Sequence, residues 1–130
     1  GRVGVAAFRT THLDAARMRG ARRHPGLPFD AYSLLLQAGG KRLAYSGDLG
    51  ALADLEPLLL RPLDVLITEA AHVEAAQVRG FLAGRDIGRV LVTHVARERR
   101  APGDGRRGAV PRAKALAGWR LVADGEVVGF

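Results

Sequence analysis

The chain has 130 residues, which fits one domain and is long enough to bury a core. It contains no cysteine, so disulfides and thiolate metal ligands are excluded and any metal must be held by His, Asp or Glu. No apolar stretch approaches the roughly 18 residues that span a bilayer, and no signal peptide opens the chain, so we expect a soluble, cytoplasmic protein without a membrane partner. The net charge of +7 comes mostly from arginine and favours an anionic substrate, with nucleic acid as one candidate. Clustered arginines, however, commonly lie in solvated loops.

The first half of the chain predicts three strands and one short helix. Residues 3–9 are strand-like from the start, which suggests a piece of something longer, and residues 10–30 predict a polar, Arg-rich connection. Residues 31–37 and 41–46 predict an antiparallel hairpin around Gly39 and Gly40. Residues 51–60 predict a helix that Pro57 shortens or breaks.

The second half predicts a parallel crossover. Residues 64–68 and 89–93 read as buried strands on either side of a helix at residues 73–83, an order that implies a βαβ unit. A basic loop over residues 97–108, a helix over 110–117 and a closing hairpin of residues 119–123 with 126–130 follow. The predicted fold class is therefore α/β, with a mixed sheet and flanking helices.

Polar side chains follow three of the predicted strands at the point where each strand ends. These residues are Asp48, then Glu69 with His72, and finally His94. Because the carboxyl ends of parallel strands gather along one edge of a sheet, we expect Asp48 and His94 to lie close together. Imidazole with carboxylate suits zinc, manganese or iron. For Asp48 taken alone, an N-cap of the following helix is the alternative.

The ordered set of strand-end motifs resembles the C-terminal half of the metallo-β-lactamase fold. The matching stretches are "YSGDLG", "DVLITEAAH", "GRVLVTH" and "LVADGEVVGF". The resemblance implies half of a four-layered αββα sandwich, with Asp48 bridging two metal ions and His94 completing the shell of one. The family's His-X-His-X-Asp-His signature, which lies in the N-terminal half, has no match here. Residues 1–130 would thus be a partial metallo-β-lactamase-like domain that supplies only a minority of the metal ligands and cannot form the complete metal site alone.

Two further histidines and one acid are candidate site residues. Glu69 and His72 loosely resemble the His-Glu-Ala-Thr motif of ribonuclease Z, with Thr68 where that motif has its catalytic His, so both are candidate catalytic residues. Helix capping or support of the site is the alternative for both. His12 follows a strand, where phosphodiesterase-type members of the superfamily often carry a substrate-side His, but an ordinary loop histidine is the simpler interpretation. His24 is most simply solvated.

The function that the resemblance implies is the C-terminal part of a metal-dependent hydrolase. Two divalent ions, zinc foremost and manganese or iron as alternatives, would activate a water to attack a phosphodiester or other ester. The alternative is a non-catalytic domain that binds nucleic acid or a partner subunit. With only Asp48 and His94 as ligands, the chain alone is expected to be inactive and to bind zinc weakly. Because the strands are apolar on both sides, we expect the missing N-terminal half or a homodimer partner to cover one face.

Overall fold

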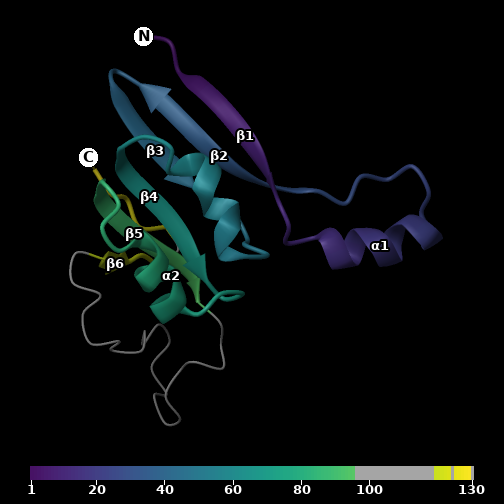
Figure 1. Ribbon diagram of the computed structural model, residues 1–130. Coiled ribbons are helices and arrows are strands. Elements are labelled where there is room, and N and C mark those ends of the chain that lie inside the picture. The colour runs from purple at the N-terminus through teal and green to yellow at the C-terminus, as the bar shows by residue number, and fades with distance from the viewer. Residues whose placement is uncertain (96–118, 124, 130) are drawn as a thin grey trace.

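A six-stranded mixed sheet organises the computed structural model, which describes residues 1–95, 119–123 and 125–129 (Figure 1). The strands are β1 (Gly4–Thr10), β2 (Ala31–Ala38), β3 (Lys41–Tyr45), β4 (Leu63–Ala70), β5 (Ile87–Val95) and β6 (Trp119–Leu121), and they lie in the sheet in this order. β1 to β3 are antiparallel neighbours, whereas β3 to β6 run parallel. The predicted α/β class with a mixed sheet is therefore confirmed.

The predicted hairpin and the predicted crossover are both present. β2 and β3 pair antiparallel with Ala38 opposite Lys41, and Gly39 and Gly40 between them have positive φ angles of 56° and 78° that suit glycine. β4 and β5 are parallel neighbours, and the chain between them forms the helix α2 (Ala75–Leu82), whose side chains Val78 and Leu82 are buried.

The core lies between the sheet and the two helical elements that cover one of its faces. One of them is α2, and the other is η1 (Leu52–Leu58), a short 3-10 helix that contains Pro57, as the predicted shortening requires. Figure 1 shows both on the same side of the sheet. Buried apolar side chains fill the space between, among them Leu35, Ala44, Leu49, Leu55, Leu58, Leu66, Val78, Val90 and Val92.

One of the connections contains a helix that the sequence did not predict, and the predicted closing hairpin is wrong. The connection at residues 10–30 contains the helix α1 (Asp14–Arg23), which extends away from the sheet in Figure 1; alanine and arginine are strong helix formers, and the segment has no proline before residue 25. The closing hairpin is absent from the described residues, because β6 pairs in parallel with β5 and residues 126–129 are not in a strand. Pairing with β5 packs Trp119 and Leu121 against the core, whereas Val127 remains 92% exposed. The predicted loop at 97–108 and helix at 110–117 lie outside the described residues.

The second face of the sheet, which we call the open face, is also apolar. The register of the strands places on it Val5, Ala7, Tyr32, Leu34, Leu36, Leu43, Tyr45, Val65, Ile67 and Leu91. Val65 and Leu91 are buried, whereas Val5 is 63% and Tyr45 is 40% exposed. The sequence predicted strands that are apolar on both faces, and the structure shows that the apolar side chains of the open face become exposed towards β1. None of the described helices is long and apolar enough to cross a lipid bilayer.

Candidate metal centre

The carboxyl ends of β3, β4 and β5 meet at one edge of the sheet and bring the predicted side chains together. Asp48 follows β3 and His94 lies near the end of β5, and their Oδ1 and Nδ1 atoms are 2.9 Å apart although 46 residues separate them in the chain. The predicted proximity of Asp48 and His94 is therefore confirmed. Both side chains are about half exposed, so solvent and a ligand can reach them.

A bulge in β5 aims His94 at this edge. The pairing of β4 with β5 shifts between Glu69 and Ala70, whose partners are Thr93 and Val95, so His94 is the extra residue without an opposite partner. His94 has a φ of 48°, a left-handed conformation that costs a non-glycine residue roughly 1–2 kcal/mol. Bulges re-aim side chains, and backbone strain of this kind concentrates at functional sites.

The loop that carries Asp48 depends on two glycines. Gly47 has a φ of 59°, and a Cβ there would lie 2.6 Å from the backbone oxygen of Tyr32. A Cβ on Gly50 would lie 2.5 Å or less from the Thr11 backbone and His12 N. The residue at the N-cap of η1 is Ala51, so the alternative that Asp48 caps this helix is wrong. The Asp48 carboxylate is directed to histidines instead.

His12 belongs to the cluster, contrary to its simpler interpretation as an ordinary loop histidine. Its Nε2 atom lies 3.6 Å from Oδ2 of Asp48, so the two oxygens of Asp48 contact two different imidazoles. Its ring is 4.3 Å from the ring of His72, and the ring of His72 is 5.3 Å from that of His94, measured between centroids. The only signal in the sequence was its place after β1 in "TTHLD". His24 instead follows α1 as its C-terminal cap.

The buried side chain of Glu69 bonds to the loop after Asp48 and to His72. Its side chain is only 2% exposed, and it accepts hydrogen bonds from the backbone N–H groups of Leu49, Ala71 and His72. Its Oε1 atom is also 3.2 Å from Nδ1 of His72. Glu69 therefore holds the loop after Asp48 and the side chain of His72 in place, and the prediction that Glu69 and His72 are catalytic stays a prediction.

The donor atoms of the cluster fit a divalent transition-metal ion. His12, Asp48 and His72 form one group whose ligand atoms lie within 4.8 Å of one another, and Glu69, His72 and His94 form a second. Asp48 contacts His94 through Oδ1 at 2.9 Å and His12 through Oδ2 at 3.6 Å, and His72 belongs to both groups. Neutral imidazole and carboxylate are also the donor set that zinc accepts in the absence of thiolates.

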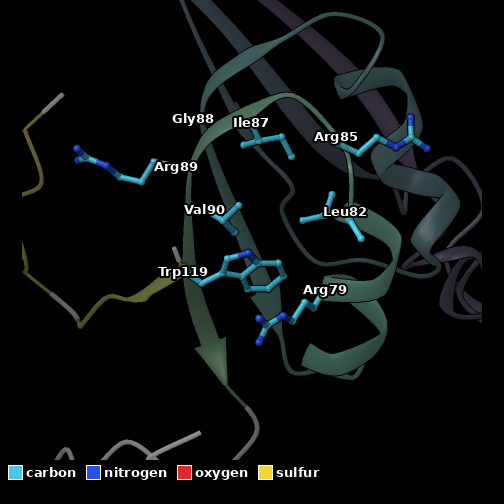
Figure 2. A pocket seen from close by; sticks show the side chains of 9 residues that line it. Arg79, Leu82, Arg85, Ile87, Gly88, Arg89, Val90 and Trp119 are labelled. Carbon is cyan, nitrogen blue, oxygen red and sulfur yellow. The ribbon is translucent and has the colours of Figure 1, made fainter. Parts of the chain in front are cut away.

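A separate cavity of about 270 Å³ lies at the other end of β5 (Figure 2). Trp119, Val90 and Leu82 form its apolar floor, Arg79 lies beside the Trp119 ring, and the side chain of Arg89 points away. Among the described residues, no His, Asp or Glu side chain lines this cavity, which sets it apart from the histidine cluster as a metal site.

Comparisons of the chain with protein-family models, with curated proteins and with solved structures found no match. The interpretation of the metal centre therefore depends on the residues of this chain and on their geometry.

Proposed function

We propose that the cluster at the carboxyl edge of the sheet is the divalent-metal centre of a hydrolase, with zinc as the preferred ion. The observation that carries the proposal is the convergence of Asp48, His94 and His12 from three separate segments, with both oxygens of Asp48 in contact with imidazole nitrogens. Among the described residues, the groups whose donor atoms lie within 4.8 Å of one another are His12–Asp48–His72 and Glu69–His72–His94. His12 and His94 must therefore move closer together for Asp48, His94 and His12 to form the usual catalytic zinc site, which has three protein ligands and an open fourth position. When bound, the ion supplies a Lewis acid that lowers the pKa of a coordinated water to about 7.

In this proposal the pair of His72 and Glu69 handles the proton. With Glu69 accepting a hydrogen bond from Nδ1 of His72, the imidazole is held as the tautomer whose Nε2 carries a lone pair. The ring of His72 contacts the rings of both His12 and His94. Its Nε2 atom can therefore exchange a proton with a substrate or water held beside the metal ligands. His72 is 37% exposed, which leaves it accessible to a substrate.

We propose a phosphodiester, or another anionic ester, as the substrate class. The net charge of +7 supports an anionic substrate, because a positive field raises the local concentration of such molecules. The same charge favours nucleic-acid binding without catalysis as the second candidate function. Zinc binding and turnover distinguish the two.

We further propose that the sheet is one half of an αββα sandwich of the metallo-β-lactamase type. The open face supports this proposal, because a second sheet packed on it would bury the exposed Val5 and Tyr45. A further polypeptide segment or a second copy of the chain would supply that sheet. A second metal ion, which the resemblance implies, would take additional ligands from it.

A zinc titration of purified protein tests the metal centre. We expect one equivalent of zinc to bind, and Asp48→Asn or His94→Ala to weaken its binding by at least tenfold. His24→Ala removes a histidine outside the cluster and serves as the matched control, with unchanged affinity expected. Equal weakening by all three variants, or no binding by the wild type, would refute the proposal.

Turnover of bis-p-nitrophenyl phosphate with added zinc, which two ligands alone would not support but His12 as a third donor would, tests the assignment of His72. Loss of a positioned acid–base group costs about 10²–10⁴ in rate, so His72→Gln should abolish most turnover while zinc affinity changes little. If His72→Gln instead loses zinc in parallel with His94→Ala, His72 is a metal ligand. Tight binding of nucleic acid by a wild type that neither binds zinc nor turns over substrate favours the non-catalytic function.

A further inference from the structure

One buried carboxylate outside the metal cluster has more hydrogen-bond partners than its own helix explains. Asp54 is 8% exposed and lies in the first turn of η1. It accepts hydrogen bonds from the backbone N–H groups of Gly50 (2.9 Å), Ala51 (3.1 Å) and Thr11 (3.1 Å), and from the Thr11 hydroxyl (3.1 Å). A buried carboxylate is stable only when it is satisfied in this way.

Half of this network is local and half is not. The bonds from Gly50 and Ala51 cap the start of η1, as an acid in the first turn of a helix commonly does. The bonds from Thr11 come from 43 residues away in the chain, from the residue directly before His12. Capping of η1 does not require them.

Two other contacts join the same two loops. The Thr10 hydroxyl donates to the backbone oxygen of Asp48 at 3.2 Å, and Thr10 is only 1% exposed. Gly50 approaches Thr11 and His12 so closely that a side chain could not fit between them. The segment that carries His12 is therefore joined to the segment that carries Asp48 by the bonds between Thr11 and Asp54, by the bond between Thr10 and Asp48, and by the close approach of Gly50.

We propose that Asp54 is a positioning residue for the metal centre, acting through His12. It holds the Thr11 backbone against the Asp48 loop, so that Nε2 of His12 faces Oδ2 of Asp48. The described hydrogen bonds of Asp54 go to Thr11, Gly50 and Ala51 and not to donor atoms of the cluster. The inference rests on the proposed metal centre for its functional meaning, but the geometric part can be tested without metal.

The first test compares zinc affinities in a chelator competition assay. Asp54→Asn keeps the size of the side chain but replaces one accepting oxygen with a donor, and we expect zinc affinity to fall by about 10- to 100-fold, as for other groups that orient metal ligands. Asp64→Asn is the matched control, because Asp64 also accepts a backbone N–H, from Arg42, but lies outside the cluster. The zinc affinity of Asp64→Asn should stay within about twofold of the wild type, because a substitution away from the site usually changes a free energy by less than about 0.5 kcal/mol.

A double-mutant cycle separates positioning from a general effect on the fold. In a His12→Ala background, Asp54→Asn should cause no further loss of zinc affinity, because the residue through which it acts is gone. An equal loss in both backgrounds overturns the proposal. If Asp54→Asn does not fold, Thr11→Ala removes only the hydroxyl contact and should lower zinc affinity by about fivefold, the equivalent of one hydrogen bond, in the wild type and not in His12→Ala.

A metal-free measurement keeps this inference separate from the proposed function. In NMR spectra without zinc, Asp54→Asn, or Thr11→Ala where it replaces that variant, should shift the imidazole signals of His12, whereas Asp64→Asn should not. If the wild type binds no zinc but these shifts occur, the positioning role stands and the proposed metal function fails. Unchanged His12 signals overturn the positioning role whatever the zinc result.

Discussion

The left-handed backbone of His94 predicts an unusual reversal in the effects of glycine and alanine. Replacing His94 by either residue removes the imidazole and its contact with Asp48, so this loss cancels when His94→Gly is compared with His94→Ala. What remains is the preference of the backbone for each residue at a φ of 48°. At such an angle glycine avoids the steric cost that alanine bears.

The magnitude follows from two opposing effects. A left-handed conformation costs a residue with a Cβ roughly 1–2 kcal/mol, and glycine is spared this cost. Glycine in turn loses more backbone entropy on folding than alanine, by roughly 0.5–1 kcal/mol. We therefore expect His94→Gly to be more stable than His94→Ala by about 0.75 kcal/mol, the difference between the midpoints of these two ranges, with about 0–1.5 kcal/mol as the full span.

Thr93 provides the matched control, because it precedes His94 in β5 and has no positive φ. There only the entropy effect applies, and Thr93→Gly should be less stable than Thr93→Ala by roughly 0.5–1 kcal/mol. The assay is urea unfolding followed by tryptophan fluorescence. With a urea dependence of about 2 kcal/mol per molar, the midpoints within each pair should differ by about 0.3–0.5 M, with opposite signs at the two positions.

A result with the same sign at both positions would refute the reasoning. If His94→Ala were more stable than His94→Gly, the backbone at His94 would not be left-handed, and the bulge that aims this side chain at Asp48 would be misassigned. The zinc assay should show equal loss of affinity in both His94 variants, since neither has a ligand at this position.

Three other predictions concern pH dependence, the core and the open face. Hydrogen bonds from Lys41 and a backbone N–H lower the pKa of Asp64, so its stabilisation is complete above the unfolded pKa of about 3.9 and disappears as the pH falls through the folded value. The stability difference between wild type and Asp64→Asn in urea titrations should thus close in acid, and a difference that persists at the lowest pH contradicts this. Leu66→Ala, at a fully buried position, should cost about 2–5 kcal/mol in the same assay, and a loss below about 1 kcal/mol would mean that the sheet and helices do not pack as described. Light scattering should give at least twice the 13.8 kDa of one chain, with Tyr45→Lys shifting the protein towards the monomer, and a monomeric wild type would show that the open face needs no partner.

The elements that the sequence predicted well are those specified by neighbouring residues. The β2–β3 hairpin follows from two apolar runs around Gly39 and Gly40, and the β4–α2–β5 unit follows from the change between a buried strand and an amphipathic helix. The pairing of Asp48 with His94 could be predicted because parallel strands place their carboxyl ends at one edge, whatever the details of packing.

The elements that could not be predicted depend on competition between distant segments. The chain around residues 119–129 has the local pattern of a hairpin, but β6 pairs with β5 instead. This pairing packs Trp119 and Leu121 against the core. Strand propensity measures how well a residue fits a half-buried surface, and it cannot say which surface is available.

The place of His12 is the most consequential instance of such a distant effect. The only metal ligands predicted from the sequence were Asp48 and His94, and two ligands leave most of a coordination shell to water. His12 becomes a third donor only because Thr11 bonds to Asp54 and because Gly50 has no side chain, and neither feature has a local signature next to His12. The donor atoms of His12, Asp48 and His72 already lie within 4.8 Å of one another, so less free energy is spent on ordering the ligands when a metal binds. The structure therefore supports tighter zinc binding by this chain than its sequence predicts, and makes His12→Ala as informative a variant as His94→Ala in the zinc titration.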